Sequence, residues 1–183
     1  MISRLRTFYY KIKYQYLLGK AIIGKGTIIK CKLAIQGPGK VVVGSNCLFD
    51  SDPWGEDHVT LYTHRSHARI TIGNRVVLRA TRFGSHLSII IKDNAVLENA
   101  SIYDSDFHNM DATKRDEDFN PRDSKVVIGE GSYVGCECLA SKGTVLGNNV
   151  IMLSGSVIGT KIIPGGSAIS GNPARILKPA STN

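Results

Sequence analysis

Hydrophobic residues recur at every sixth position over much of the chain. From position 128 the sequence divides into six-residue units that each begin with a hydrophobic residue: IGEGSY, VGCECL, ASKGTV, LGNNVI, MLSGSV and IGTKII. The same frame fits IKDNAV, LENASI and YDSDFH between positions 91 and 108, and weaker copies begin at Ile23, Val43 and Ile72. A helix would scatter these leading residues around its surface, because its period is 3.6 residues. The repeat therefore predicts short extended segments joined by turns at six-residue intervals.

The predicted segments are too short to form a core separately. Each can bury its leading residue only if successive coils stack, with strands about 4.8 Å apart. Glycine, which is frequent at the second position of the unit, suits a tight corner. With 183 residues and 42% hydrophobic content, the chain is long enough for one domain. The pattern thus predicts an all-β solenoid of stacked parallel strands and excludes a helical bundle.

The positive charge of the chain is concentrated at its beginning. Residues 1–40 hold nine lysines and arginines and no acidic residue, whereas the net charge of the whole chain is +8. Residues 1–20 also form a basic amphipathic segment, whose hydrophobic residues follow a helical stripe: Leu5, Phe8, Tyr9, Ile12 and Tyr16. One interpretation is a short helix whose stripe covers the open end of the solenoid. The other is peripheral contact of residues 1–18 with anionic lipid or a lipid-linked acidic glycan. No nucleic-acid-binding motif accompanies the charge, so nucleic acid is not an expected partner.

The sequence favours a reducing, cytoplasmic environment. Its longest apolar runs, such as 87–91, are far shorter than the roughly 20 residues of a membrane span. The first 30 residues lack the apolar block of a signal peptide. The four cysteines, at positions 31, 47, 136 and 138, form no CxxC pair, so neither disulfides nor a zinc site is expected. The expected location is the cytoplasm, with the inner face of the membrane as the alternative.

Three motifs resemble those of a known family. The repeat follows [LIV]-G-x-x-[STAV]-x, residues 104–111 read DSDFHNMD, and residues 170–179 read SGNPARILKP. Together they are similar to hexapeptide-repeat acyltransferases, in particular the sugar O-acetyltransferase branch that includes maltose, galactoside and polysaccharide-modifying enzymes. The resemblance implies a left-handed parallel β-helix over residues 21–164, with loops at 50–67 and 109–125 and a C-terminal extension at 165–183. Pro164 and Pro173 would mark where the helix stops, and the resemblance also implies a homotrimer with active sites between subunits.

The resemblance implies acetyl transfer from acetyl-CoA to a sugar hydroxyl in glycan or surface polysaccharide synthesis. His108 would be the general base that takes the hydroxyl proton. Asp104, Asp106 and Asp111 flank it, and any of them is a candidate to orient the imidazole or to bind the acceptor. Asp106 is favoured because residues i and i+2 of an extended segment share a face, whereas Asp104 can also be interpreted as a turn-forming residue.

The resemblance also suggests residues for the oxyanion and for coenzyme A. The backbone amide of Cys136 corresponds to the donor in the W-I-G-S segment of the family, with Tyr133 in place of the tryptophan and Glu137 after Cys136. Because one coil takes 18 residues, Ser154 should stack on Cys136, so Ser154 and Gly155 are expected cofactor contacts. Lys161 and Arg175 match positions where the family places cations near the coenzyme A phosphates. Trp54, in the first loop, is a candidate to stack on a sugar.

Three alternatives are open. The first is N-acetylation of an amino sugar by the same base. The second is a metal enzyme like γ-class carbonic anhydrase, which needs an H-x4-H pair, whereas the closest pair here is His64 and His67. The third is a solenoid without catalytic activity. Arg79, Thr81 and Arg82 occupy the region where some sugar acetyltransferases have an asparagine, so a simple galactoside is not the expected acceptor.

Overall fold

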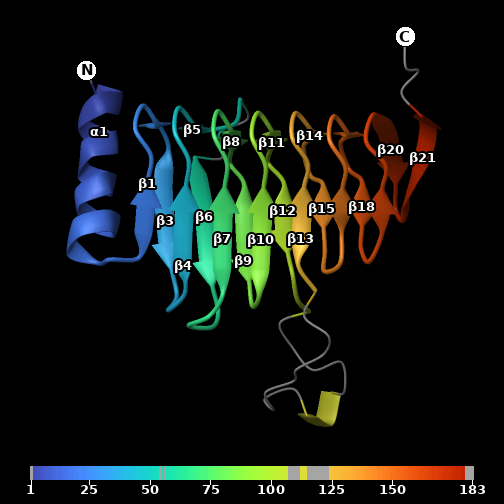
Figure 1. Cartoon of the computed structure of the whole chain (residues 1–183), viewed down its shortest axis with the longest axis horizontal. Helices are drawn as coiled ribbons and strands as arrows, with labels where there is room; N and C mark the ends of the chain where they lie inside the picture. The colour runs from blue at the N-terminus through green and yellow to red at the C-terminus, as the bar shows by residue number, and fades with distance from the viewer. Residues whose placement is uncertain (1, 54, 56, 107–111, 115–123, 180–183) are drawn as a thin grey trace.

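The chain forms a three-sided prism of stacked coils with a helix across one end (Figure 1). The computed structural model describes residues 2–53, 55, 57–106, 112–114 and 124–179. His108, Asp111 and Trp54 lie outside the described residues, as does most of the predicted loop 109–125, of which Ala112–Lys114 form a short 3-10 helix.

Each side of the prism is one sheet, and consecutive strands along the chain belong to successive sides. In the described residues, sheet A contains β1 (Ala21–Ile23), β4 (Lys40–Val43), β7 (Arg69–Ile72), β10 (Ser88–Ile91), β13 (Val126–Ile128), β16 (Val145–Leu146) and β19 (Ile162–Ile163). Sheet B contains β2 (Ile28–Ile29), β5 (Leu48–Asp50), β8 (Val77–Arg79), β11 (Val96–Glu98), β14 (Tyr133–Val134), β17 (Ile151–Met152), β20 (Ser167–Gly171) and β21 (Ala174–Pro179). Sheet C contains β3 (Lys32–Gln36), β6 (His58–Thr63), β9 (Arg82–Ser85), β12 (Ser101–Tyr103), β15 (Leu139–Ala140) and β18 (Val157–Ile158).

The leading residues of the six-residue units form the core, as the repeat predicts. All six units from position 128 place this residue inside, with at most 2% of its surface exposed: Ile128, Val134, Ala140, Leu146, Met152 and Ile158. The last unit departs from the frame. Ile128 pairs with Leu146, 18 positions later, but Leu146 pairs with Ile163, only 17 positions later. Ile162 consequently points outward and is 76% exposed.

Close packing between coils explains the glycine at the second position of the unit. A Cβ on Gly129 would lie 2.1 Å from the carbonyl oxygen of Gly147 in the next coil. A Cβ on Gly147 would lie 2.4 Å from the amide nitrogen of Gly165. Both distances are far shorter than a van der Waals contact, so only glycine lets the corners stack at the spacing of the strands.

Two predicted boundaries are wrong. β6, at His58–Thr63, runs through the segment 50–67 that the sequence suggests is an irregular loop, and it pairs in parallel with β3 and β9. The β-helix also continues past Pro164, because β20 pairs in parallel with β17. After β20 the chain turns back, and β21 pairs with β20 in the antiparallel direction.

The helix at the N-terminal end covers the edge of the first coil. It consists of α1 (Ile2–Lys11) and a π-helical turn, η1 (Ile12–Leu17). Thr7 Oγ1 accepts a hydrogen bond from the Ile29 amide at 2.9 Å, and the Gln15 side chain accepts one from the Ile23 amide at 3.1 Å. The buried Tyr14 hydroxyl donates to the Leu33 carbonyl at 3.0 Å. These side chains satisfy backbone groups that an open sheet edge would leave unpaired.

The helix faces the coil with a different side from the one that the sequence suggests. Leu5, Phe8, Tyr9 and Tyr16, four residues of the predicted hydrophobic stripe, are each at least 56% exposed. The segment therefore caps the solenoid, but mainly through polar groups and Tyr10 and Tyr14, and not through that stripe. No helix in the described part of the chain combines the length and apolar character that a bilayer span requires.

Candidate active site

Asp104 has a structural role at the corner between sheets C and A. Its side chain is fully buried. The carboxylate accepts hydrogen bonds from the Ser85 hydroxyl at 2.7 Å and from the amides of His86, Leu87 and Ser88 at 2.7, 2.9 and 2.6 Å. It is thus a turn-stabilising aspartate, as one interpretation of the sequence proposes, but the turn that it holds belongs to the preceding coil.

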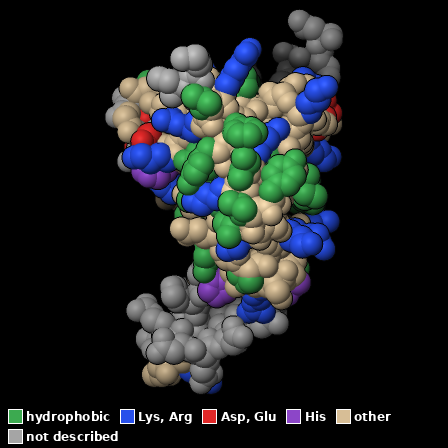
Figure 2. Space-filling model, turned by 90° about the vertical axis from the view of Figure 1, so that its left-hand side faces the viewer, with side chains coloured by type: hydrophobic (Ala, Val, Ile, Leu, Met, Phe, Trp, Pro, Cys, Tyr) green, Lys and Arg blue, Asp and Glu red, His purple; other side chains and the backbone are tan. Residues whose placement is uncertain are grey.

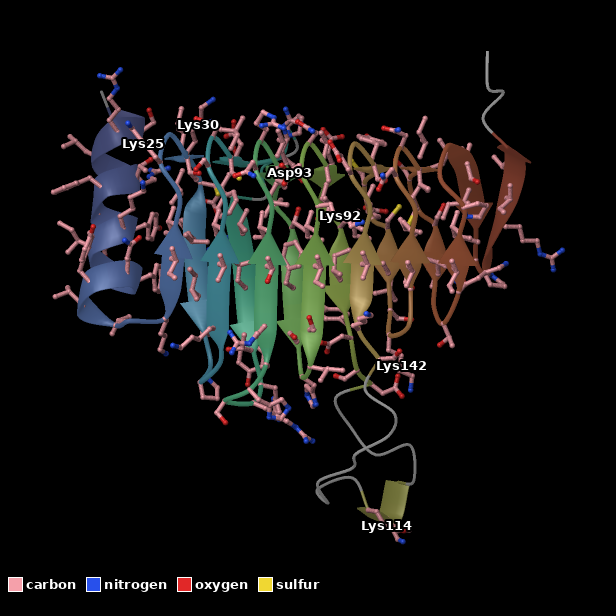
Figure 3. All side chains as sticks on the ribbon, viewed as in Figure 1. Lys25, Lys30, Lys92, Asp93, Lys114 and Lys142 are labelled. Atoms are coloured by element: carbon pink, nitrogen blue, oxygen red, sulfur yellow. The ribbon has the colours of Figure 1, made fainter. Side chains whose placement is uncertain are left out.

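The same corner is anchored on both sides of the segment that contains His108. The Ser124 amide donates to the Asp104 carbonyl at 3.3 Å, and the Gly143 amide donates to the Ser124 carbonyl at 3.0 Å. The residues that precede and follow the segment are therefore tied to each other and to the next coil. Figure 3 shows Lys142 on this lower edge of the prism, at a different corner from Lys92 and Asp93.

Asp106 lies at the surface of this corner and is paired with Lys142. Its carboxylate accepts a hydrogen bond from the Lys142 ammonium group, and the two side chains are 30% and 27% exposed. Asp106 also lines a hollow of about 540 Å³ on the outside of sheet C, together with Tyr62, Arg82 and Tyr103. Asp104 and Asp106 are the two candidate partners of His108 among the described residues. Of these two, Asp106 is the one that lines a hollow where a ligand can bind.

A second hollow continues across sheet C toward the opposite corner. It has a volume of about 380 Å³, shares Arg82 and Tyr103 with the first, and is also lined by Asn99, Glu137 and Cys138. We call the two together the sheet C hollow. Arg82 and Tyr103 thus lie between Asp106 and the corner that follows Cys136. Arg82 is among the residues that the sequence singles out, whereas no motif marks Tyr62 and Tyr103, whose outward positions follow from strict alternation along β6 and β12.

The Cys136 corner has the stacked backbone that the 18-residue coil predicts. The Gly155 amide donates to the Cys136 carbonyl at 2.8 Å, and the Gly135 amide donates to the Met152 carbonyl at 2.9 Å. Ser154 and Gly155 are exposed on the following coil. The Cys136 N–H has no protein acceptor among the described residues.

The side chains near this corner are held in neutral or paired forms. Burial raises the pKa of the Cys136 thiol, so the thiol is protonated at neutral pH and is a poor nucleophile. The Tyr133 hydroxyl donates to Glu98 at 2.7 Å, and this bond raises the pKa of Tyr133 to about 12. Arg79 donates to the same Glu98 carboxylate at 2.5 Å. Tyr133 is therefore fixed by an ion pair on sheet B.

The two predicted phosphate-binding cations lie at different places. Arg175 is exposed on β21 and pairs with Ser170, close to the stacked backbone of the Cys136 corner. Lys161 is exposed at the corner between sheets C and A, where the adjacent Thr160 amide donates to the Lys142 carbonyl. A single chain therefore does not bring Lys161 to Cys136, Ser154 and Gly155.

The histidines of the described residues do not gather around a metal site. The rings of His64 and His86 stack with centroids 4.3 Å apart and planes inclined by 11°. The Tyr62 hydroxyl lies 3.3 Å from His64 Nδ1. Across the ranges that the structure describes, no three His, Cys, Asp or Glu side chains are grouped as metal ligands would be.

Comparisons with known proteins identify relatives in structure. The sequence matches no family model and no curated protein. The fold is similar to that of a mutant of AntD, an N-acyltransferase from Bacillus cereus in complex with dTDP and coenzyme A (TM-score 0.66, 19% identity, 92% of this chain and 89% of that chain covered). It is also similar to a maltose O-acetyltransferase from Clostridium difficile 630 (TM-score 0.56, 24% identity, 94% and 77% covered).

A third similar structure is named for its hexapeptide repeat. It is a hexapeptide-repeat acetyltransferase from Vibrio cholerae O1 biovar eltor complexed with acetyl coenzyme A, with a TM-score of 0.58 and 17% identity. The alignment covers 97% of this chain and 79% of that chain. These relatives are left-handed parallel β-helices, which confirms the predicted fold class. The chain therefore has the fold of the hexapeptide-repeat acyltransferases.

Proposed function

We propose that this protein is an acetyltransferase that moves the acetyl group of acetyl-CoA to a hydroxyl of a sugar in a glycan or polysaccharide precursor. The observation that carries the proposal is the sheet C hollow. It extends from Asp106, two residues before His108 in the sequence, to Glu137 and Cys138, which follow Cys136. The relatives in structure include one crystallised with acetyl coenzyme A and one named for maltose O-acetylation, which supports the donor and the acceptor class.

In this mechanism His108 of one copy acts with the Cys136 N–H of a neighbouring copy, because in a single chain the corner that follows β12 and the Cys136 corner lie at opposite edges of sheet C. Acetyl-CoA supplies an acetyl thioester. The imidazole of His108 takes the proton of the acceptor hydroxyl as its oxygen forms a bond to the thioester carbon, and the carbon–sulfur bond breaks to release coenzyme A. The Cys136 N–H donates to the carbonyl oxygen as negative charge develops on it. His108 then gives the proton to the departing sulfur, so it is neutral again at the end of the cycle.

The other residues bind the two substrates. Ser154 and Gly155 offer exposed backbone along the coil stack for the amides of the pantetheine arm, and Arg175 offers a cation for a phosphate at the end of that stack. Tyr62 and Tyr103 offer aromatic rings for a sugar, with Arg82 and the Asp106–Lys142 pair for its polar groups. We propose that Trp54 also contacts the acceptor.

The second candidate is N-acetylation of an amino sugar. It is supported by the likeness to AntD, whose printed descriptions name an N-acyltransferase and a complex with dTDP-4-amino-4,6-dideoxyglucose. The same base serves either reaction, because both require loss of one proton from the attacking atom. Amino sugars and their hydroxyl counterparts, offered as matched pairs of nucleotide sugars, distinguish the two reactions.

Assembly and location complete the proposal. Sheets A and B each carry an outward row of aliphatic residues along the stack, which supports the homotrimer. Lys161 lies at a different corner from Cys136, so a neighbouring copy is the natural source of this cation at the donor site. All four cysteines are free thiols, and three of them are buried, which supports the reducing cytoplasm.

The test is donor-dependent release of free thiol from acetyl-CoA with nucleotide sugars and oligosaccharides as acceptors. Wild-type protein should release thiol with at least one sugar of the screen. His108→Ala should lower the rate by about 10² to 10⁴-fold, the usual contribution of a general base. Circular dichroism and thermal unfolding of the variant should match wild type. Near-wild-type turnover by His108→Ala would remove the proposed base, and absence of acceptor-dependent release across the screen would reject the function.

A further inference from the structure

The outer face of the capping helix carries a band of large hydrophobic side chains. Leu5 and Phe8 are each 65% exposed and Tyr9 is 56% exposed on α1, and Tyr16 and Leu17 on η1 are 73% and 75% exposed. Figure 2 views this end of the molecule and shows hydrophobic side chains grouped at its centre, with lysines and arginines among and around them and acidic side chains only at the margin. We call this surface the end face.

The end face is not explained by the capping role of the helix. Thr7, Tyr10, Tyr14 and Gln15 make the contacts that close the first coil, and they lie on the opposite side of the helix from the hydrophobic band. Isolated exposed hydrophobic residues are common on any surface, but a contiguous band usually marks an interaction site. A cap alone would be more soluble with polar residues at these positions.

A groove continues the end face between α1 and β2. It has a volume of about 430 Å³ and is lined by Phe8 and Ile28, with Arg4 and Lys11 among its polar residues. Ile28 is 44% exposed. The groove thus combines an apolar lining with positive charge, which suits a ligand that has an acidic head and an apolar tail.

The surrounding charge selects the partner. Residues 1–40 carry nine basic residues and no acidic one. Figure 3 shows Lys25 and Lys30 at the end of the prism next to α1. Lys30 is paired with Asp50 at 3.3 Å, whereas Lys25 and Arg4 are exposed, with no ion pair in the described residues. The basic side chains of two end faces would repel each other, so a second copy of the chain does not fit this surface. A partner surface that is both apolar and negatively charged fits it.

We propose that the end face docks on an anionic phospholipid bilayer. An interfacial helix with aromatic and leucine residues on one face and basic residues beside them is the arrangement that binds such a surface. α1 lies across the end of the prism (Figure 1). Docking through α1 therefore orients the long axis of the prism roughly perpendicular to the membrane. The sheet C hollow is on a side wall and stays open to acceptors. The proposal goes beyond the proposed function and does not depend on it.

The experiment is co-sedimentation of the full chain with vesicles of phosphatidylcholine, with and without 30 mol% phosphatidylglycerol. Wild-type protein should bind the anionic vesicles about tenfold more tightly than the neutral ones, and added salt should weaken this binding. Leu5→Ser/Phe8→Ser should reduce binding to anionic vesicles at least about tenfold. Arg4→Gln/Lys25→Gln should reduce it by about the same factor, with little effect on neutral vesicles.

The opposite end of the chain offers a matched control. Ile176 and Leu177 on β21 are 42% and 58% exposed, so Ile176→Ser/Leu177→Ser makes a similar chemical change far from the end face and should leave vesicle binding unchanged. Equal binding to both vesicle types, or full binding by Leu5→Ser/Phe8→Ser, would overturn the proposal. So would concentration-dependent self-association that Leu5→Ser/Phe8→Ser abolishes, which would make a second copy the partner. Thioester turnover with a free sugar should be the same in the two end-face variants as in wild type.

Discussion

Two aspartates that are two positions apart have opposite environments. Asp104 is fully buried and accepts four hydrogen bonds, three of them from the backbone, whereas Asp106 is paired with a lysine at the edge of the sheet C hollow. The sequence favours Asp106 as the partner of His108 but leaves Asp104 a candidate, since short-range patterns do not reveal which carboxylate the fold encloses. The structure separates a residue that holds the corner of the preceding coil from one that lines the sheet C hollow.

This separation predicts different effects for the same substitution. Asp104→Asn replaces an acceptor oxygen with an amide group that faces N–H donors, so it should lower the free energy of unfolding by about 3 kcal/mol. Asp106→Asn removes only a partly exposed ion pair and should change stability by less than about 1 kcal/mol. Urea unfolding followed by circular dichroism measures both values.

Turnover should show the reverse order. At a temperature where both variants are folded, Asp106→Asn should lower acceptor-dependent thiol release more than Asp104→Asn does. A greater loss of stability in Asp106→Asn than in Asp104→Asn would contradict the assignment of the buried carboxylate as the structural one.

At the scale of elements, the capping helix shows how polar side chains close a solenoid. The first coil presents edge amides and carbonyls, and the helix satisfies several of them through Thr7, Tyr10, Tyr14 and Gln15. The hydrophobic stripe suggests a cap with an apolar inner face, because a stripe on a helix normally faces the core. That expectation fails here since edge strands need hydrogen-bond partners more than they need apolar cover.

Thr7 provides a test of the capping role. Thr7→Val keeps the shape of the side chain but leaves the Ile29 amide without its acceptor, so the free energy of unfolding should fall by about 2 kcal/mol. Thr7→Ser keeps the hydroxyl and should stay within about 0.5 kcal/mol of wild type. Hydrogen exchange should quicken at the Ile29 amide in Thr7→Val alone. Equal stability of Thr7→Val and wild type would show that this bond does not hold the cap.

At the scale of the whole molecule, the six-residue repeat predicted the fold more completely than the other motifs predicted the candidate site. The six-residue period identified the inward residue of each unit correctly from Ile128 to Ile158, because one buried side chain per unit is what makes coils stack. It missed the shortened last coil, where Ile163 takes the inward place, and β6 within an apparent loop. A periodic pattern predicts the regular coils. It does not predict a one-residue deletion or a strand outside the repeat, because these are determined by pairing with the neighbouring coils.

The site was harder to predict because it is assembled across coils. The stacking of the coil that contains Ser154 and Gly155 on the Cys136 corner follows from the coil length alone. The sheet C hollow does not, since Tyr62, Arg82 and Tyr103 come from three different strands with no common motif. Their shared position becomes visible only once the register of β6, β9 and β12 is known.

The three sides of the prism differ in a way that bears on assembly. Outward residues on sheet A include Ile22, Val42, Ile90, Val127 and Val145, which neighbour one another along the stack directly or through Thr71. Sheet B has a similar outward apolar row, made of Ile28, Leu48, Val77, Val96, Tyr133 and Ile151, beside an outward charged row of Asp50, Arg79 and Glu98. The outward residues of β6 and β9 on sheet C are His58, Thr60, Tyr62 and Arg82. A cyclic trimer uses two different patches on each subunit, and sheets A and B each carry a continuous apolar row, whereas sheet C holds the hollow.

The trimer can therefore be tested by placing one lysine on each side. Val127→Lys on sheet A and Val96→Lys on sheet B should break the assembly, because each would bury a charge without a partner. Val157→Lys on sheet C should leave it intact. Light scattering after size exclusion should give about three times the chain mass of 19.9 kDa for wild type and Val157→Lys, and the single-chain mass for the other two. A wild-type mass of one chain, or dissociation by Val157→Lys alone, would contradict this arrangement.

The same variants connect the assembly to the membrane. Prisms that associate side by side about an axis parallel to their length carry their three end faces at one end, so docking is trivalent and stronger than that of one chain. Val127→Lys should consequently bind phosphatidylglycerol vesicles at least about tenfold more weakly than Val157→Lys, although neither substitution touches the end face. Equal binding by the two variants, together with confirmed dissociation of Val127→Lys, would mean that the end faces of a trimer do not lie on a common plane.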